Sequence, residues 1–190
     1  MLTQTAVSVD EYFDLLHNSE EKLEYYDGEI VAMSGAQPNH NIITVNLTVE
    51  FVLCLKKLGC VVLNSDQLIS IGPHGPYVFP DIVVVCEKPL YEKTKRGLKS
   101  LLNPRIVVEV LSDSTEAHDR GNKLEYYQAL ASLENFILVS TKKKKVEIYR
   151  KSDGGDWLHH IYNEGSPLMK IGECEIDLRE IYSNVDFDAA

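Results

Sequence analysis

The stretch that decides the fold is Ile106-Val107-Val108-Glu109-Val110-Leu111, an apolar run interrupted by a single acid. Continuous runs rich in β-branched residues are typical of strands that are covered on both faces of a sheet. A second run, Ile82-Val83-Val84-Val85-Cys86, lies upstream and directly follows Asp81. Strands buried on both faces need helices on either side, so the sequence predicts an α/β fold with a mixed sheet flanked by helices.

The helices expected around these strands are recognised by apolar residues at steps of three and four. They are predicted at residues 8–17, 40–58, about 120–131 and near 178–182. Ser8 is a candidate N-cap for the first, with Glu11 at the spacing of a capping box. Gly59 follows the second in the position that often ends a helix.

Further strands are predicted from apolar runs bounded by turn residues. Asp27-Gly28 between two apolar runs indicates a hairpin over residues 23–33. The other strands are expected at residues 60–71 and 77–86, as a pair at 135–140 and 145–150, and as a later pair at 157–162 and 167–171. Residues 87–103 are expected to form a polar excursion, and 112–119 a loop. No repeat or linker divides the chain, so residues 1–190 are predicted to form a single domain.

The composition limits the classes of protein to which the chain can belong. Its 190 residues carry nineteen Lys and Arg against twenty-nine Asp and Glu, a formal net charge of -10. This charge argues against a protein that holds nucleic acid mainly through a basic surface. The chain has no apolar run of about eighteen residues or more, so no membrane span is expected.

The four cysteines, Cys54, Cys60, Cys86 and Cys174, are scattered and form no CxxC pair. We expect reduced thiols in the core, not zinc ligands or disulfides. The N-terminus is polar and lacks the apolar segment of a signal peptide. A cytoplasmic location is therefore predicted.

Two acids stand where none is expected in a buried strand. Asp81 leads one apolar run and Glu109 interrupts the other, and an ionised carboxylate in such a place is costly unless it is paired or binds a metal. Asp81 is equally compatible with a turn acid after Pro80. For Glu109 the alternative is a solvent-facing strand position, which the apolar neighbours on both sides disfavour. Adjacent strands could supply the two carboxylates for Mg²⁺ or Mn²⁺, which prefer oxygen ligands. A bound cation would polarise a phosphodiester and activate water.

Two further residues are candidates for the same site. Lys123 shares a helix face with Asp119 and could point back over the two acids to stabilise developing negative charge. An i,i+4 salt bridge with Asp119 is the alternative, and the spacing alone favours it. His40 could contact phosphate or act in acid–base chemistry, while a polar role at a helix N-terminus is the simpler interpretation.

These motifs together resemble the PD-(D/E)xK nuclease superfamily. The chain looks most similar to the Uma-type family of restriction-endonuclease-like proteins. The resemblance rests on Pro80-Asp81, on Glu109 within Val-Val-Glu-Val-Leu-Ser, and on Asp119 to Lys123 ahead of Tyr126-Tyr127. Leu23-Glu24-Tyr25 before Asp27-Gly28-Glu29, and His40 at the start of the long helix, also match.

The resemblance implies an αβββαβ core, with an N-terminal helix and hairpin before it and a β appendix after it. It implies that Asp81 and Glu109 are metal ligands and that Glu24 is an additional acid at the site edge. The superfamily's lysine two residues after the acid is replaced by Leu111. The resemblance therefore implies that Lys123 takes over its role.

A basic segment joins the two strands that carry the acids. Residues 88–105 contain six basic side chains and one acid, Glu92. Phosphates could be held there by Lys93, Lys95, Arg96 and Lys99. An ordinary solvated loop is the alternative, and Lys142 to Lys145 is most simply a hairpin turn.

The sequence thus predicts a Mg²⁺- or Mn²⁺-dependent endonuclease that hydrolyses DNA phosphodiesters, with RNA as a substrate left open. A catalytically inactive nuclease-like module that binds nucleic acid or regulates is the alternative. Cutting both strands of a duplex calls for two sites, so a homodimer is expected. The β appendix after residue 155 is the expected part of its interface.

Overall fold

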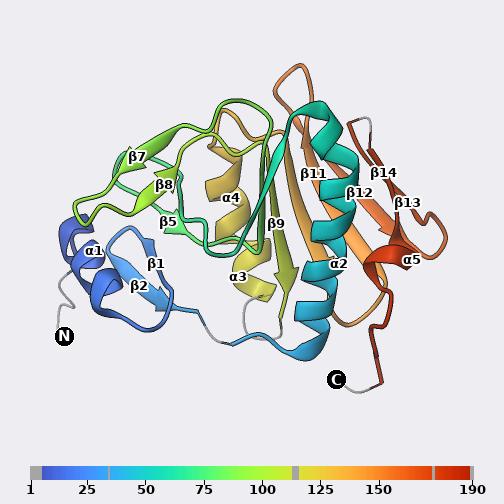
Figure 1. Cartoon of the computed structure of the whole chain (residues 1–190), viewed down its shortest axis with the longest axis horizontal. Coiled ribbons are helices and arrows are strands. Elements are labelled where there is room, and N and C mark those ends of the chain that lie inside the picture. The colour runs from blue at the N-terminus through green and yellow to red at the C-terminus, as the bar shows by residue number, and fades with distance from the viewer. Residues whose placement is uncertain (1–5, 34, 113–115, 173, 189–190) are drawn as a thin grey trace.

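The computed structural model describes residues 6–33, 35–112, 116–172 and 174–188. Within these ranges the strands form two six-stranded sheets and a separate hairpin. Figure 1 shows the N-terminal sheet and its helix on the left, and the second sheet, here called the central sheet, on the right. The predicted mixed α/β fold is confirmed.

The central sheet carries the expected αβββαβ core. In spatial order it consists of β12 (Trp157–Asn163), β11 (Lys145–Lys151), β10 (Asn135–Ser140), β9 (Ile106–Leu111), β6 (Ile82–Val85) and β3 (Val61–Asn64). Only β9 and β10 run parallel, and a parallel pair needs a crossover. Helices α3 (Glu116–Arg120) and α4 (Asn122–Gln128) supply it. With α2 (Pro38–Leu55) in front, the order is the predicted αβββαβ.

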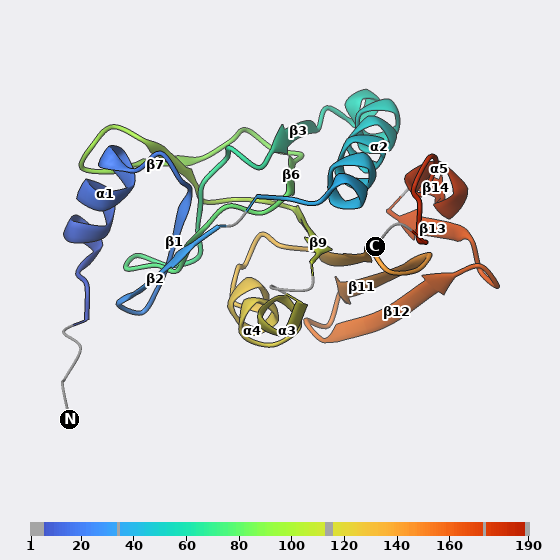
Figure 2. The same cartoon turned by 90° about the horizontal axis from the view of Figure 1, so that it is seen from below.

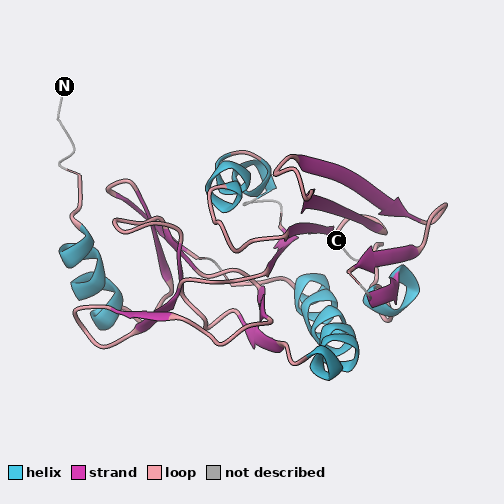
Figure 3. Ribbon diagram, turned by 90° about the horizontal axis from the view of Figure 1, so that it is seen from above, coloured by secondary structure: helices cyan, strands magenta, loops and turns pink. Residues whose placement is uncertain are grey.

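Helices cover both faces of this sheet, as Figures 2 and 3 show from opposite sides. On one face the α2 residues at steps of four are buried: Ile43, Leu47, Phe51 and Leu55. On the other face Tyr127 of α4 packs with Val107 and Leu138. Successive residues of β9 point to opposite faces, so both faces of this strand are apolar and each buried side chain contributes about 1.5–3 kcal/mol.

Two predicted helices have different bounds in the structure. The long helix begins at Pro38 and ends at Leu55, and the 3-10 turn η1 (Lys56–Leu58) leads to Gly59, whose φ of 78° ends the helix. The helix expected from about residue 120 begins at Glu116, breaks at Gly121 and ends at Gln128. The loop predicted at 112–119 is therefore shorter, and its residues 113–115 lie outside the described ranges.

The N-terminal sheet contains six short strands. In spatial order they are β2 (Glu29–Ala32), β1 (Leu23–Tyr26), β5 (Tyr77–Val78), β4 (Ile69–Ser70), β8 (Lys99–Leu101) and β7 (Tyr91–Lys93). The hairpin of β1 and β2 is confirmed, since Asp27 and Gly28 both have positive φ, as a type I′ turn requires. Helix α1 (Val9–Asn18) begins with the predicted capping box of Ser8 and Glu11 and buries Tyr12 and Phe13 against this sheet.

The two long strands predicted around residue 74 are each divided between the sheets. Residues 60–71 form β3 in the central sheet and then β4 in the N-terminal sheet. Residues 77–86 form β5 in the N-terminal sheet and then β6 in the central sheet. Pro80 lacks an N–H and cannot continue a ladder, so the chain leaves one sheet there and enters the other. The polar excursion is not a plain loop, because it contains the hairpin of β7 and β8.

The predicted pairing of residues 157–162 with 167–171 is wrong. β12 pairs with β11 and extends the central sheet, whereas β13 (Leu168–Ile171) pairs with β14 (Cys174–Asp177), a strand that was not predicted. Alternate residues of β13, Met169 and Ile171, are buried in the core beneath α2. Helix α5 (Leu178–Ile181) follows at the predicted place.

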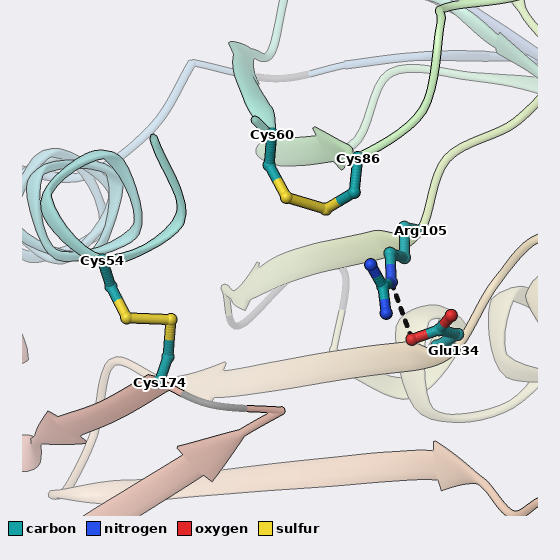
Figure 4. The surroundings of a disulfide bond; sticks show 6 residues. All are labelled: Cys54, Cys60, Cys86, Arg105, Glu134 and Cys174. Atoms are coloured by element: carbon teal, nitrogen blue, oxygen red, sulfur yellow. Dashed lines mark hydrogen bonds and ion pairs between the residues drawn. A yellow bond between two sulfur atoms is a disulfide. The ribbon is translucent and has the colours of Figure 1, made fainter. Parts of the chain in front are cut away.

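The prediction of reduced thiols is also wrong. Cys54 of α2 is bonded to Cys174 of β14, and Cys60 is bonded to Cys86 (Figure 4). The second pair continues the register of β3 and β6 by one position beyond Val61 and Val85. The pairs meet only in space, which explains why their spacing in the sequence carried no signal. No helix in the described ranges has the length and apolarity needed to cross a membrane.

Candidate active site

Asp81 and Glu109 lie next to each other across two strands. The register of β6 and β9 sets Ile82 opposite Val108, so the next position pairs Asp81 with Glu109. Asp81 Oδ2 accepts a hydrogen bond of 2.7 Å from the backbone N–H of Val110, which fixes the carboxylate against β9. Both residues are buried. The structure thus brings together the two acids that the sequence singled out.

Lys123 reaches this pair from α4. Its Nζ lies 3.1 Å from Glu109 Oε1, 3.4 Å from Glu24 Oε2 and 3.4 Å from Asp119 Oδ1. The i,i+4 salt bridge with Asp119 and the contact with Glu109 therefore exist together and are not alternatives. Lys123 is 5% exposed, so one buried ammonium faces three carboxylates.

Glu24 is brought in from the N-terminal sheet. Its Oε1 accepts a hydrogen bond of 2.8 Å from the backbone N–H of Phe79, and its Oε2 accepts one of 2.6 Å from the Tyr26 hydroxyl. Phe79 directly precedes Pro80-Asp81, so Glu24 ties the start of β6 to β1. Glu24 is 3% exposed and belongs to the same buried cluster as Lys123.

Three members of the cluster were missed as site residues by the sequence analysis. Asp119 is 2% exposed, and the hydroxyl of the fully buried Tyr127 donates a hydrogen bond of 2.6 Å to Glu109 Oε1. Tyr26 binds Glu24 as described above. Asp119 on α3 and Lys123 and Tyr127 on α4 follow one another at steps of four. That spacing is the signal that could have identified Asp119 and Tyr127.

His40 contacts Asp81 from the first turn of α2. Its Nε2 lies 3.2 Å from Asp81 Oδ2. Burial lowers the pKa of His40, but the hydrogen bond to Asp81 and the charge of that carboxylate outweigh burial, so the pKa is raised above its ordinary value. The candidate role of His40 beside Asp81 thus has a geometric basis.

The buried charges perturb one another strongly. Burial raises the pKa of Glu109 well above its ordinary value; the Lys123 ammonium opposes this shift, while Asp119, Asp81 and Glu24 add to it. Burial lowers the pKa of Lys123, but the negative charges of Glu109 and Glu24 outweigh it and raise that pKa well above its ordinary value. Perturbed ionisable groups gathered in this way are typical of functional sites, although structural ion-pair networks produce them as well.

The donor set fits a hard divalent cation. Mg²⁺ binds through one or two carboxylates, with water and substrate phosphate completing the shell. Asp81 Oδ2 and Glu109 Oε1 are occupied by hydrogen bonds, whereas Asp81 Oδ1 and Glu109 Oε2 receive none from any residue of the described ranges. Those ranges contain no group of three or more His, Cys, Asp or Glu arranged for a metal. Asp81 and Glu109 could supply the two carboxylates that Mg²⁺ commonly takes.

Leu111 fills the position where the superfamily carries a lysine. It is 3% exposed and packs in the core beneath α4. A lysine there would have to share this apolar space. The ammonium that contacts Glu109 in this chain is that of Lys123 on α4.

The predicted basic residues of the excursion lie on the β7–β8 hairpin at the far edge of the N-terminal sheet. Lys95 pairs with Asp10 and Arg96 with Asp14, both in α1. Lys99 lies over the ring of Tyr91, with Nζ 5.8 Å from its centroid. The structure does not bring these side chains, or Lys93 of β7, into contact with the buried cluster. Their role in binding phosphate stays a prediction.

The fold is that of a restriction-endonuclease-like protein. Residues 9–176 match the model of the Uma2 family, which is described as "Putative restriction endonuclease". The chain belongs to this family.

Known relatives and a solved structure agree with this assignment. The protein slr1290 of Synechocystis is 38% identical over 162 residues, covering 85% of this chain and 83% of its own length. A second Synechocystis protein, sll1609, is 30% identical over 156 residues, covering 82% and 87%. A crystal structure from Anabaena variabilis, described as a "putative nuclease", superposes with a TM-score of 0.73 at 18% identity, covering 93% of this chain and 98% of that one. At that identity the superposition supports the fold alone.

Proposed function

We propose that the protein is a metal-dependent endonuclease that hydrolyses phosphodiester bonds in DNA. The observation that carries the proposal is the contact of the Lys123 ammonium with Glu109 beside Asp81. Two carboxylates and an ammonium on neighbouring elements are the groups this chemistry needs. Family membership supports the nuclease class.

The proposed metal is Mg²⁺ or Mn²⁺, held by Asp81 and Glu109. When bound, such a cation polarises the phosphodiester and lowers the pKa of a bound water. Lys123 holds Glu109 in place and stabilises the negative charge that develops on the phosphate. Glu24 positions Lys123, and the Tyr127 hydroxyl fixes the Glu109 carboxylate through its hydrogen bond.

His40 is proposed as the residue that orients Asp81. Its imidazole and the backbone N–H of Val110 both bind Asp81 Oδ2. This arrangement leaves Oδ1 for the cation. The His40 imidazole can donate from Nε2 to Asp81 and can also hold a proton near the phosphate.

The test is cleavage of plasmid and oligonucleotide DNA by the full chain with Mg²⁺, with Mn²⁺ or with EDTA. Cleavage is expected with either cation and not with EDTA. Calorimetry should show cation binding to the wild type and weaker binding to Glu109→Gln. A wild type that neither binds the cation nor cuts DNA or RNA would overturn the proposal.

One observation favours the alternative of an inactive nucleic-acid-binding module. Glu109 and Lys123 are 4% and 5% exposed and already neutralise each other. A protein that binds DNA with every cation tested, but never cuts it, would establish this alternative.

We also propose that the protein acts as a homodimer, because cleavage of both strands of a duplex calls for two sites. Light scattering over a wide concentration range tests this. A dimer mass is expected, and a monomer mass throughout would refute it.

A further inference from the structure

A row of aromatic side chains lies on the outer part of the central sheet. Tyr149 of β11 and His159 of β12 are cross-strand partners, and their rings stack with centroids 4.4 Å apart and planes 3° apart. Trp157 lies two residues before His159 and therefore points to the same face. Trp157 is partly exposed and His159 exposed. His159 and Trp157 leave ring surface exposed to a ligand on this face, while Tyr149 lies stacked between His159 and Phe136 and supports the row.

Basic side chains frame the row. Residues 142–151 hold six of the nineteen Lys and Arg of the chain and a single acid, Glu147. Glu147 is 4% exposed and contacts two cationic groups, Lys145 at 2.8 Å and Arg120 at 2.7 Å, and the His159 ring at 3.1 Å. The buried acid thus fixes these groups around the rings, while its own charge is more than balanced.

Two more acids lie near these cations. Glu116 of α3 binds Arg120 and Lys142, and Glu164 binds Lys144. Lys151, the cross-strand partner of Trp157, lies at the opposite end of the row. Lys145 and Arg120 thus lie at one end of the aromatic row and Lys151 at the other, although the net charge of the chain is -10.

The row shares its face with the candidate active site. Register places Glu109 opposite Leu138, Leu138 opposite Glu147, and Glu147 opposite Ile161. Glu109 and Glu147 are thus aligned across β9, β10 and β11, and lie two strand spacings, or about 10 Å, apart. Arg120, which binds Glu147, directly follows Asp119 of the buried cluster. Figure 2 shows α3 and α4 beside β11 and β12 on this side of the sheet.

We propose that this face, formed by Tyr149, Trp157 and His159 with Arg120, Lys145 and Lys151, binds a single-stranded stretch of nucleic acid. Bases stack on aromatic rings without regard to sequence, and cations in between hold the phosphates. The wide flat rings fit unpaired bases, whose faces are hidden in a duplex. The proposal rests on the proposed function in one respect: it takes the bound single-stranded nucleic acid to be part of the substrate of the nearby candidate active site.

The test uses the fact that Trp157 is the only tryptophan in the chain. The full-length protein is titrated with a short oligothymidylate in EDTA, so that neither metal nor cleavage enters. Stacking of a base on Trp157 should quench its fluorescence, and the affinity should fall with rising salt as counterions are released. A duplex of the same length should bind at least about fivefold more weakly.

Variants are compared by the fluorescence anisotropy of a labelled oligothymidylate. Trp157→Leu keeps an apolar side chain against the core but removes the ring, and His159→Ala removes an exposed ring; each should weaken binding at least about fivefold. Lys151→Gln should reduce the salt dependence of binding. Matched controls are Leu158→Ala, a neighbour in β12 that is 47% exposed, and Lys170→Gln on β13. Both controls should bind as the wild type does.

The proposal is overturned if fluorescence and anisotropy do not change, if a duplex binds as tightly as the single strand, or if the controls lose as much affinity as the ring variants. The binding assay contains EDTA, so its result does not depend on whether the protein can cut DNA. Conversely, a protein that cuts DNA while its ring variants bind normally retains the nuclease proposal and loses this one.

Discussion

Lys123 Nζ lies 3.1 Å from Glu109 Oε1, and both side chains are almost wholly buried. Glu24 and Asp119 face the same ammonium, so the negative charges in the cluster outnumber the positive one. Such an excess is costly in a protein interior unless further protons or cations balance it. The cluster is therefore a place where proton and metal binding should both be measurable through stability.

Replacement of Glu109 by Gln tests the acid on β9. The shape is kept while one negative charge is removed, so the proposed cation should bind more weakly and cleavage should disappear. The free energy of unfolding should stay within about 1 kcal/mol of the wild type or rise, because Lys123 keeps two acidic partners and the repulsion among the acids falls. Calorimetry, DNA cleavage and urea unfolding measure these quantities.

Glu175→Gln is the matched control for this variant. Glu175 lies on β14 with its side chain 56% exposed and pairs with Lys170 at the surface. It should retain wild-type metal binding and cleavage. A Glu109→Gln protein that still cuts DNA would remove Glu109 from the proposed site.

The pH dependence of stability should contain a contribution from Glu147. Burial raises the pKa of Glu147, but hydrogen bonds from Lys145 and Arg120 outweigh burial, so the pKa lies below its ordinary value of 4.5. An acid with a lowered folded pKa adds stability that is present above the unfolded value and is lost as pH falls through the folded value. Glu147→Gln should cost about 1–3 kcal/mol at neutral pH.

The measurement is urea unfolding of wild type and Glu147→Gln across a pH series. The difference in unfolding free energy should be constant at neutral pH and shrink below about pH 4.5. A difference that grows as pH falls would contradict the assigned direction of the pKa shift.

The elements of the fold that could be predicted are those with strong local signals. The apolar runs around Glu109 and after Asp81, the capping box at Ser8 and the Asp27-Gly28 turn all form as expected. The assignment of strands to sheets could not be predicted. It depends on long-range pairing, such as β12 with β11, which periodicity does not contain.

The candidate site could be predicted in part for the same reason. Asp81 and Glu109 stood out because acids in apolar runs are rare, and both lie in the cluster. The contact of Glu24 with Lys123 joins residues ninety-nine positions apart, and no local pattern reveals it. The family resemblance supplied that residue. Tyr127 could be recognised from the local sequence, because it lies four residues, about one helical turn, after Lys123.

The two disulfides give a prediction about stability. In a chain-entropy view, a bond that closes a longer loop restricts the unfolded chain more. The Cys54–Cys174 bond spans 120 residues and the Cys60–Cys86 bond spans 26. We expect loss of either to cost about 2–5 kcal/mol, with the larger loss for Cys54→Ser with Cys174→Ser.

Thiol titration of the denatured, unreduced protein supplies the direct check, and no reactive thiol is expected. Four reactive thiols would restore the original prediction of reduced cysteines. The double variants are compared by urea unfolding under the same oxidising conditions.

Replacement of Lys123 by Met tests the charge balance of the whole cluster. Met keeps the length of the apolar stem but leaves Glu24, Glu109 and Asp119 without their ammonium, so at neutral pH the free energy of unfolding should fall by about 3–5 kcal/mol. Lys170→Met, at an exposed ion pair, should change it by less than about 1 kcal/mol.

Two additional measurements distinguish the loss of charge from the loss of packing as the cause of the lower stability of Lys123→Met. Adding Glu109→Gln removes one of the stranded acids, so the double variant should be more stable than Lys123→Met alone, with a coupling of about 0.5–3 kcal/mol. Mg²⁺ should stabilise Lys123→Met more than it stabilises the wild type, since a cation that binds only the folded state shifts the unfolding equilibrium. If packing alone were responsible, neither the second substitution nor Mg²⁺ would recover any stability. Cleavage should stay low even with Mg²⁺ bound, because the ammonium that faces the developing charge is gone.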